Sequence, residues 1–378
     1  MADWSGPTNS LLLLLKHLGD QFEARVLVPG QGAFTSALDE AGIGYRSVPS
    51  LKRRSIRQIR RLIRKDGYDL VYGNNTSGGC RNAMIAAKLA RRPFICHVRG
   101  MGKRGQWKRL GFLRLADAVI AVSEATARSV APYVDPTRLH VVHNGVDTDT
   151  FDEEDSEGDK RELRLPDVSR NRRLIASVSH LCPRKGQLHA VEAMAGIASA
   201  VPSAHLLLIG ALDRDPEYVS RVEERIRELG LQEHATVLGF RRDVHALLRE
   251  SELLLHTAIS DPHPRAVIEA MAMGLPVVGF GIDGVSETVD SGSTGFLCAV
   301  GDVEGLARAA ERLLLDSTLR RECSNRARRL ARERFSADAT ARRVRTIIEQ
   351  TLAATGWTPD TIERPRVRAG TAGPSLGR

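Results

Sequence analysis

The chain has 378 residues, of which 42% are hydrophobic, so it can form two ordinary domains and is not a disordered protein. It has no apolar run of about 18 residues, which excludes a membrane-spanning helix. Its five cysteines are odd in number and never spaced as CxxC, which argues for reduced thiols in a cytoplasm and against a zinc site or a disulfide scaffold. The net charge of +9 indicates anionic partners: phosphorylated substrates, anionic lipid or nucleic acid.

Short β-rich runs alternate with helical patterns through the first part of the chain. Apolar residues at helical spacing, such as Ile56, Ile59 and Ile63, separate runs that are typical of buried strands. This alternation indicates βαβ units, and therefore a parallel sheet covered by helices on both faces. The strands predicted here are Ala24–Val28, Tyr45–Val48, Asp69–Gly73, Phe94–Val98, Ala118–Val122 and Leu139–Val142.

The pattern breaks between residues 152 and 173, where an acidic, polar segment predicts an interdomain linker. The alternation then resumes, with helices predicted at Pro216–Leu229 and Arg265–Met273. The strands predicted in this second half are Leu174–Ser179, His205–Gly210, Thr236–Gly239, Leu253–His256, Val277–Phe280 and Gly295–Cys298. An arginine-rich helical region follows from Val303 to Leu352.

The pattern as a whole predicts an α/β chain of two similar lobes in tandem. We expect a first lobe over residues 1–151, a linker over 152–173 and a second lobe over 174–335. A C-terminal helix is expected over 336–354. Residues 355–378 lack periodicity and are expected to form a mobile basic tail.

The most informative segment runs from Asp261 to Pro276. Its predicted helix, Arg265–Met273, is nearly all apolar, so the carboxylate of Glu269 needs a strong partner to stay charged. From the helix alone two interpretations stay open. Arg265, one turn earlier, pairs with Glu269. Alternatively, Glu269 accepts hydrogen bonds from the two ribose hydroxyls of a nucleotide, whose diphosphate faces the helix N-terminus.

This segment resembles the signature of the family 4 glycosyltransferases of GT-B fold. That signature has two acidic residues with seven between them, here Asp261 and Glu269, followed by Ala-Met-Ala, Gly and Pro-Val-Val. Further motifs follow the order of the family over nearly the whole chain, from about Ser5 to Leu352. They are His143-Asn144-Gly145-Val146-Asp147, the phosphate loop Ser179-His-Leu-Cys-Pro-Arg-Lys185-Gly186, the strand end Leu238-Gly239-Phe240 and the turn Asp283-Gly-Val-Ser-Glu287.

The resemblance implies two Rossmann-like lobes with the active site in a cleft between them, and C-terminal helices that return toward the first lobe. It places Lys185, helped by Arg184, on the donor diphosphate, where cations neutralise the charge that grows on the leaving phosphate. The other implied positions are Glu269 on the ribose, Asp261 on the donor sugar, Gly239 beside the base, Glu287, Gly6 in the loop before the first helix, and His97, which reaches the sugar from the first lobe.

The activity that the resemblance implies is transfer of a hexose-type unit from a nucleotide diphosphate sugar to a hydroxyl, with retention. The acceptor would be a glycan or a lipid-linked glycan of polysaccharide, glycolipid or cell-envelope synthesis. The leaving phosphate itself would take the acceptor proton, so catalysis is mostly positioning and charge stabilisation. No metal ion and no cofactor besides the nucleotide sugar is expected.

Five positions depart from the family pattern. Asp261 stands where Glu is usual, His263-Pro264 replaces Phe-Gly and so lacks one backbone N–H, and His180 replaces an arginine that contacts phosphate. Asp283 replaces the first glycine of a Gly-Gly turn. These departures bear on the donor sugar and the rate more than on the reaction class.

Three other functions compete with this interpretation. A nicotinamide-dependent dehydrogenase is disfavoured, because Gly30-Gln-Gly32 follows a strand but lacks the third glycine of that fingerprint. A nucleotide-sugar epimerase of the same fold and a degenerate, non-catalytic glycosyltransferase-like subunit stay open.

Two basic segments lie in the first part of the chain. The segment from Lys52 to Lys65 is predicted to be an amphipathic helix with isoleucines inward and cations outward. The second basic segment contains Lys103, Arg104, Lys108, Arg109 and Arg114, with Trp107 among them. Solvated charges are one interpretation of these segments, and docking on an anionic membrane at its inner face is the other. Nucleic acid is not expected, because no recognised binding motif accompanies the charge.

The start of the chain is unusual for lobes of this type, which open with an apolar strand running into a glycine-containing loop. Here Met1–Trp4 reach Gly6 almost at once, and no strand-length apolar run precedes the helix expected at Leu11–His17. We therefore expect a vacant central slot in the first-lobe sheet and a native start roughly ten residues upstream. The alternative is that Met1–Trp4 and a rearranged edge fill this slot.

Overall fold

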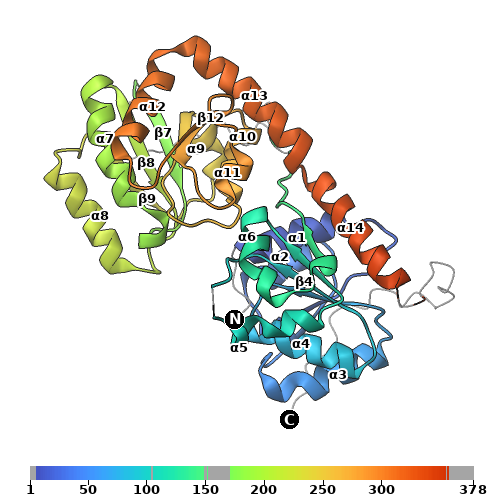
Figure 1. Cartoon of the computed structure of the whole chain (residues 1–378). Helices are drawn as coiled ribbons and strands as arrows, with labels where there is room; N and C mark the ends of the chain where they lie inside the picture. The colour runs from blue at the N-terminus through green and yellow to red at the C-terminus, as the bar shows by residue number, and fades with distance from the viewer. Residues whose placement is uncertain (1–5, 104, 149–150, 152–170, 355, 357–378) are drawn as a thin grey trace.

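The structure, a computed structural model, describes residues 6–103, 105–148, 151, 171–354 and 356. Two α/β lobes lie side by side, and a long C-terminal helical segment runs along both of them (Figure 1). Most of the expected linker and of the expected tail lies outside the described residues. The predicted α/β architecture of two Rossmann-like lobes is confirmed.

The strands of the first lobe do not form one continuous sheet. They form two separate parallel sheets. The smaller sheet pairs β1 with β2, and the larger has the order β3-β4-β5-β6. From Gly6 onward no strand precedes β1, and residues 1–5 lie outside the described part, so the expected earlier strand stays a prediction. The strands are β1 (Val26–Pro29), β2 (Tyr45–Val48), β3 (Val71–Asn74), β4 (Phe94–Val98), β5 (Ala118–Ala121) and β6 (Leu139–Val141).

The second lobe contains one parallel six-stranded sheet in the order β12-β11-β10-β7-β8-β9. The order reverses beside β7, and the carboxyl ends of strands at such a switch point form the usual ligand crevice of an open α/β sheet. Its strands are β7 (Arg173–Val178), β8 (Ala204–Ile209), β9 (Ala235–Gly239), β10 (Ser251–His256), β11 (Val277–Phe280) and β12 (Gly295–Cys298). Each coincides with a strand predicted from the sequence to within a few residues.

The helices cover both faces of the sheets, as a parallel sheet requires. In the first lobe they are α1 (Gly6–His17), α2 (Ala33–Glu40), α3 (Ile56–Lys65), α4 (Gly78–Leu89), α5 (Trp107–Leu110) and α6 (Glu124–Val130). In the second lobe and beyond they are α7 (Gln187–Ala200), α8 (Pro216–Glu228), α9 (Val244–Arg249), α10 (Arg265–Ala272), α11 (Val285–Thr288), α12 (Val303–Leu315), α13 (Ser317–Phe335) and α14 (Ala337–Ala353).

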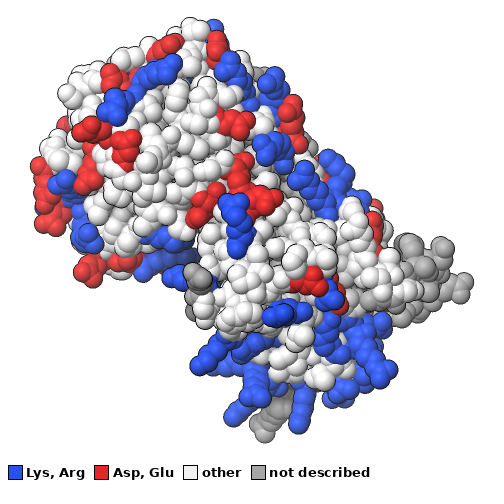
Figure 2. Space-filling view, viewed as in Figure 1, with Lys and Arg blue, Asp and Glu red and all other residues white. Residues whose placement is uncertain are grey.

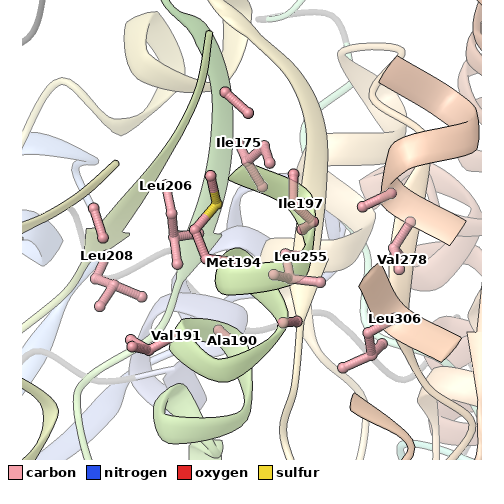
Figure 3. Packing of buried hydrophobic residues seen from close by; sticks show 14 of the residues in the cluster. Ile175, Ala190, Val191, Met194, Ile197, Leu206, Leu208, Leu255, Val278 and Leu306 are labelled. Carbon is pink, nitrogen blue, oxygen red and sulfur yellow. The ribbon is translucent and has the colours of Figure 1, made fainter. Parts of the chain in front are cut away.

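The core of the second lobe lies between its sheet and helices α7 and α12. Met194 and Ile197 of α7 face Ile175, Leu206 and Leu255 of the sheet in this fully apolar layer (Figure 3). Burying one such side chain contributes about 1.5–3 kcal/mol. This layer holds the strands rigidly, so the loops at their carboxyl ends are fixed in position.

Helix α14 returns to the first lobe, as the sequence predicted. Its Val344 and Ile348 pack in one core with Leu14 of α1 and with Ile95 and Ile120 of the first-lobe sheet. Backbone hydrogen bonds hold the chain where it passes from α13 to α14 against the first lobe. The Ala337 N–H donates to the Val146 carbonyl oxygen at 2.8 Å, and the Val146 N–H donates to the Phe335 carbonyl oxygen at 2.9 Å. The C-terminal helix is therefore part of the first lobe's core.

Candidate active site between the lobes

The loop after β7 carries the two predicted phosphate-binding cations. A short 3₁₀ turn, Pro183–Lys185, ends at Gly186, whose φ of +67° is in the left-handed region. A Cβ on Gly186 would lie 2.1 Å from the carbonyl oxygen of Thr257, so only glycine lets this loop close on the segment after β10. The loop is also held by the Ile259 N–H, which donates to the Arg184 carbonyl oxygen at 3.0 Å.

Lys185 and Asp261 form a buried ion pair at this point. The Lys185 ammonium donates to Asp261 Oδ2, and His256 Nε2 lies 3.5 Å from the same oxygen. Burial alone would raise the pKa of Asp261, but hydrogen bonding with His256 and the charge of Lys185 outweigh it and lower the pKa below its usual range. Burial lowers the pKa of His256. Asp261 is therefore an anion at neutral pH.

The turn before α11 supports Asp261 from behind. Asp283 has a φ of +36°, where a non-glycine residue is uncommon. Its Oδ2 accepts hydrogen bonds from Ser260 Oγ at 2.8 Å and from the Asp261 N–H at 3.0 Å. The Asp283 side chain thus helps to hold the backbone at Asp261 in place, which gives this residue a structural role where the family has glycine.

Glu269 and Arg265 lie one turn apart on α10, and they pair. Arg265 Nη2 donates to Glu269 Oε1 at 2.9 Å. Among the residues that the structure describes, Glu269 Oε2 has no hydrogen-bond partner, so this oxygen can accept from a ribose hydroxyl. The two interpretations of Glu269 are therefore compatible, and its role toward a ribose stays a prediction.

His180 faces the cations of the same loop. Its pKa is lowered to about 4, first by burial and then by the positive charges of Arg214, Lys185 and Arg184, with Asp261 opposing. The imidazole is therefore neutral at neutral pH, unlike the arginine that the family usually has there.

His97 lies in the first lobe, at the carboxyl end of β4. It is 1% exposed, and its Nδ1 lies 2.5 Å from the Tyr72 hydroxyl and 3.3 Å from Arg99 Nη2. Burial, reinforced by the charge of Arg99, lowers the pKa of His97 well below its usual value. His97 is thus a neutral imidazole aimed by its neighbours, and its role toward the sugar stays a prediction.

Glu287 joins the lobes. Its carboxylate accepts hydrogen bonds from the N–H groups of Glu124 and Ala125, both at 2.8 Å, at the N-terminus of α6 in the first lobe. His143 Nε2 lies 3.0 Å from the same carboxylate. In this state both oxygens of Glu287 contact the first lobe, so donor binding by Glu287 would require them to be shared or released.

The remaining two predicted positions are glycines. Gly239 ends β9 with a φ of +71°, and its carbonyl oxygen accepts a hydrogen bond from the Gly210 N–H at 2.9 Å. Gly6 begins α1, and a Cβ there would meet nothing within 4 Å. Nothing in the structure tests their contact with a donor.

Sequence analysis missed a polar network that joins the two lobes. The Asn144 N–H donates to His263 Nδ1 at 3.3 Å, and Asn144 Nδ2 donates to the His263 carbonyl oxygen at 3.1 Å. Asn144 Oδ1 accepts from Arg99 Nη1 at 2.8 Å. In the sequence, the only sign of this network was that polar residues such as Arg99 directly follow predicted strands.

Two known families match the two lobes. The family described as "Glycosyltransferase Family 4" matches residues 4–150, and the one described as "Glycosyl transferases group 1" matches residues 159–330. The chain belongs to the family 4 glycosyltransferases. It is a nucleotide-sugar-dependent, retaining enzyme of the hexosyltransferase type, and a dehydrogenase is excluded.

Individual relatives agree with this assignment. A galactosyltransferase of Escherichia coli, "UDP-Gal:alpha-D-GlcNAc-diphosphoundecaprenol alpha-1,3-galactosyltransferase", is 25% identical over 81% of this chain and 84% of its own length. An N-acetyl-alpha-D-glucosaminyl L-malate synthase of Bacillus anthracis is 29% identical over 63% of this chain and 60% of its own. The structure of HepE from Anabaena with UDP-glucose is 26% identical, covers 94% of this chain and 97% of its own, and has a TM-score of 0.80.

Two further observations concern metals and membranes. In the described ranges, no group of three or more His, Cys, Asp or Glu side chains is arranged to hold a metal ion. Of the helices that the structure describes, none has the length and apolar character needed to cross a bilayer.

Proposed function

We propose that the chain transfers a hexose from a UDP-sugar to a hydroxyl of a glycan or lipid-linked acceptor, at the cytoplasmic side of a membrane. The observation that carries this proposal is the buried Lys185–Asp261 pair, which lies just before α10, the helix that contains Glu269. UDP as the base is supported by the HepE structures, whose titles name UDP and UDP-glucose.

In the proposed donor complex, Lys185 and Asp261 would bind the donor in place of each other. Lys185 and Arg184 would move onto the diphosphate, which frees the Asp261 carboxylate to accept hydrogen bonds from the sugar hydroxyls. Two cations would neutralise the charge on the leaving UDP, and we infer that no metal ion is required for this. Pro264 removes one N–H at the start of α10, so the loop cations would carry more of the diphosphate than in relatives with glycine there.

The test is a thermal-shift panel with UDP, GDP and ADP, followed by incubation with labelled UDP-hexoses. A transferase releases UDP from its donor, whereas an epimerase would change the sugar without release and a non-catalytic subunit would do neither. Stabilisation by GDP or ADP alone would overturn the UDP assignment, because a ligand stabilises only the state that binds it.

The acceptor proposal rests on a cationic patch of the first lobe, here called the basic surface. Lys and Arg side chains gather over the end of that lobe where α3 and α5 lie (Figure 2). Trp107, 50% exposed, lies among them and suits the interface of an anionic bilayer. Arg104, also predicted here, lies outside the described residues. The basic surface comprises the exposed side chains of Arg57, Arg61, Arg64, Lys103, Lys108, Arg109 and Arg114.

A further inference from the structure

Arg99, just beyond the carboxyl end of β4, is a cation without a counter-ion. Its guanidinium donates to Asn74 Oδ1 at 2.5 Å, to Asn144 Oδ1 at 2.8 Å and to His97 Nδ1 at 3.3 Å, and all three partners are neutral. Among the residues that the structure describes, no carboxylate lies within ion-pair distance of it. Burial, opposed by Tyr72 and reinforced by Arg265, lowers the pKa of Arg99 to about 10, so it stays charged at neutral pH.

Two side chains contact His97 at Nδ1: the Tyr72 hydroxyl at 2.5 Å and Arg99 Nη2 at 3.3 Å. A guanidinium nitrogen only donates and a hydroxyl can donate, so these contacts favour the tautomer in which Nδ1 accepts and Nε2 carries the proton. His97 Nε2 is buried, and among the residues that the structure describes it has no hydrogen-bond partner. The neighbouring side chain thus presents an unsatisfied N–H donor.

The second lobe adds donors of the same kind. Nε and Nη1 of Arg265 are buried without a partner, while its Nη2 is held by Glu269. Asn144 ties Arg99 to His263, which lies two residues before Arg265. The charge of Arg265 acts on Arg99, since it helps to lower the pKa of Arg99. Of these side chains, Arg265 and His97 have buried nitrogens without a partner among the described residues.

The first helix contributes the positive end of its dipole to this edge. Asn74, which holds Arg99, also donates from Nδ2 to the carbonyl oxygen of Pro7 at 3.0 Å, in the first turn of α1. A helix N-terminus stabilises a nearby anion. Donors and positive charge without an acceptor are the pattern of an anion-binding site.

We propose that Arg99, with the His97 Nε2–H and the free nitrogens of Arg265, binds an anionic group of the acceptor, a phosphate or a carboxylate next to the hydroxyl that receives the sugar. Its first-lobe residue Arg99 follows β4, whereas the diphosphate loop of Lys185 follows β7 in the second lobe; Arg265 adjoins both sites, because its Nη2 also holds Glu269. It rests on the proposed transferase function and narrows the acceptor to an anionic one.

The test uses the full chain, with glycerol 3-phosphate as the probe and glycerol as its neutral counterpart, in the presence and absence of saturating UDP. We expect glycerol 3-phosphate, and not glycerol, to bind the UDP complex. Arg99→Gln should weaken this binding by about tenfold or more, because a charge-assisted bidentate contact is lost. Arg99→Lys, which keeps the charge without the planar fork, should lose less.

The controls separate this subsite from general effects. Arg128→Gln, an exposed arginine on α6, should bind the probe as the parent does. UDP should bind Arg99→Gln within about twofold of the parent, which also shows that the variant is folded.

Three results would overturn the proposal: no binding of glycerol 3-phosphate to the UDP complex, equal binding by Arg99→Gln, or displacement of the probe by UDP. The last result would assign Arg99 to the donor diphosphate. If UDP does not bind, but glycerol 3-phosphate binds the parent and binds Arg99→Gln more weakly, the assignment of UDP as the donor nucleotide is wrong and the anion subsite is supported.

Discussion

Glu287 of the second lobe contacts His143 of the first, with His143 Nε2 3.0 Å from Glu287 Oε2. The same carboxylate accepts two backbone N–H groups at the start of α6, so one side chain of the second lobe caps a helix of the first. Four residues earlier, Asp283 holds the Asp261 N–H. The donor-side carboxylate and the interlobe contact are therefore joined by one short turn.

Replacing Glu287 with Ala should lower the melting temperature by a few degrees, because loss of a helix cap costs about 1 kcal/mol. It should also raise the KM for the donor, since the lobes lose a contact that orients them. Asp302→Ala, which removes the cap of α12 within the second lobe, is the matched control and should change stability alone. Equal KM values for the two variants would contradict the interlobe role.

Replacing Lys185 with Ala should lower kcat by at least about a hundredfold, the scale of losing one charge-stabilising group in the transition state. Lys88 forms an exposed pair with Asp117 at 2.7 Å in the first lobe, so Lys88→Ala is the control for loss of a Lys–Asp pair. Steady-state rates with UDP-hexose decide the matter. A Lys185→Ala enzyme with the kcat of the parent would remove Lys185 from the diphosphate site.

Replacing Glu269 with Ala should abolish the thermal stabilisation by UDP, because the ribose hydroxyls lose their acceptor. Glu304 and Arg308 form an i,i+4 pair on α12 that is exposed to solvent, so Glu304→Ala is the matched control. Glu269→Ala should still unfold cooperatively, although Arg265 loses its partner. A normal UDP shift in Glu269→Ala would leave only the structural pairing with Arg265.

The strands and the donor-side loop could be predicted because the signals are local. Buried parallel strands appear in a sequence as short apolar runs, and Lys185 lies in the loop that follows one of them. The contact between Asn144 and His263 could not be predicted, because it joins residues 119 positions apart and depends on how the lobes are oriented. The lack of a carboxylate near Arg99 could not be predicted either, because it depends on which residues the fold brings next to Arg99.

The pH dependence of donor binding should come from His180, whose pKa of about 4 leaves it neutral in the free protein. A bound diphosphate adds negative charge beside the ring and raises this pKa, so binding takes up a proton. Affinity for UDP-glucose should therefore rise as the pH falls through the raised pKa of the complex, and level off below about 4, where the free protein is also protonated. His180→Gln should remove this dependence, and His180→Arg should bind more tightly at every pH. Calorimetry in two buffers of different ionisation enthalpy measures the proton uptake, and none in the parent would contradict the idea.

The basic surface should bind anionic vesicles through its exposed arginines. On α3 the side chains of Arg57, Arg61 and Arg64 face solvent, whereas Ile59 and Ile63 are buried. Replacing the three arginines with Gln should therefore leave folding intact and weaken vesicle binding, since each cation near an anionic surface contributes about 1 kcal/mol. The loss should be larger at low salt, where charges are less screened.

The matched control for the basic surface replaces three exposed arginines of α13, which belong to the other lobe and its return segment: Arg321, Arg329 and Arg334. This variant has the same net charge as the first, so a general effect of charge would weaken both equally. Co-sedimentation with vesicles of anionic and of neutral lipid measures the difference. If the two variants bind alike, or if the parent does not bind, the arginines of α3 are solvated charges and the acceptor is reached without a membrane contact at this surface.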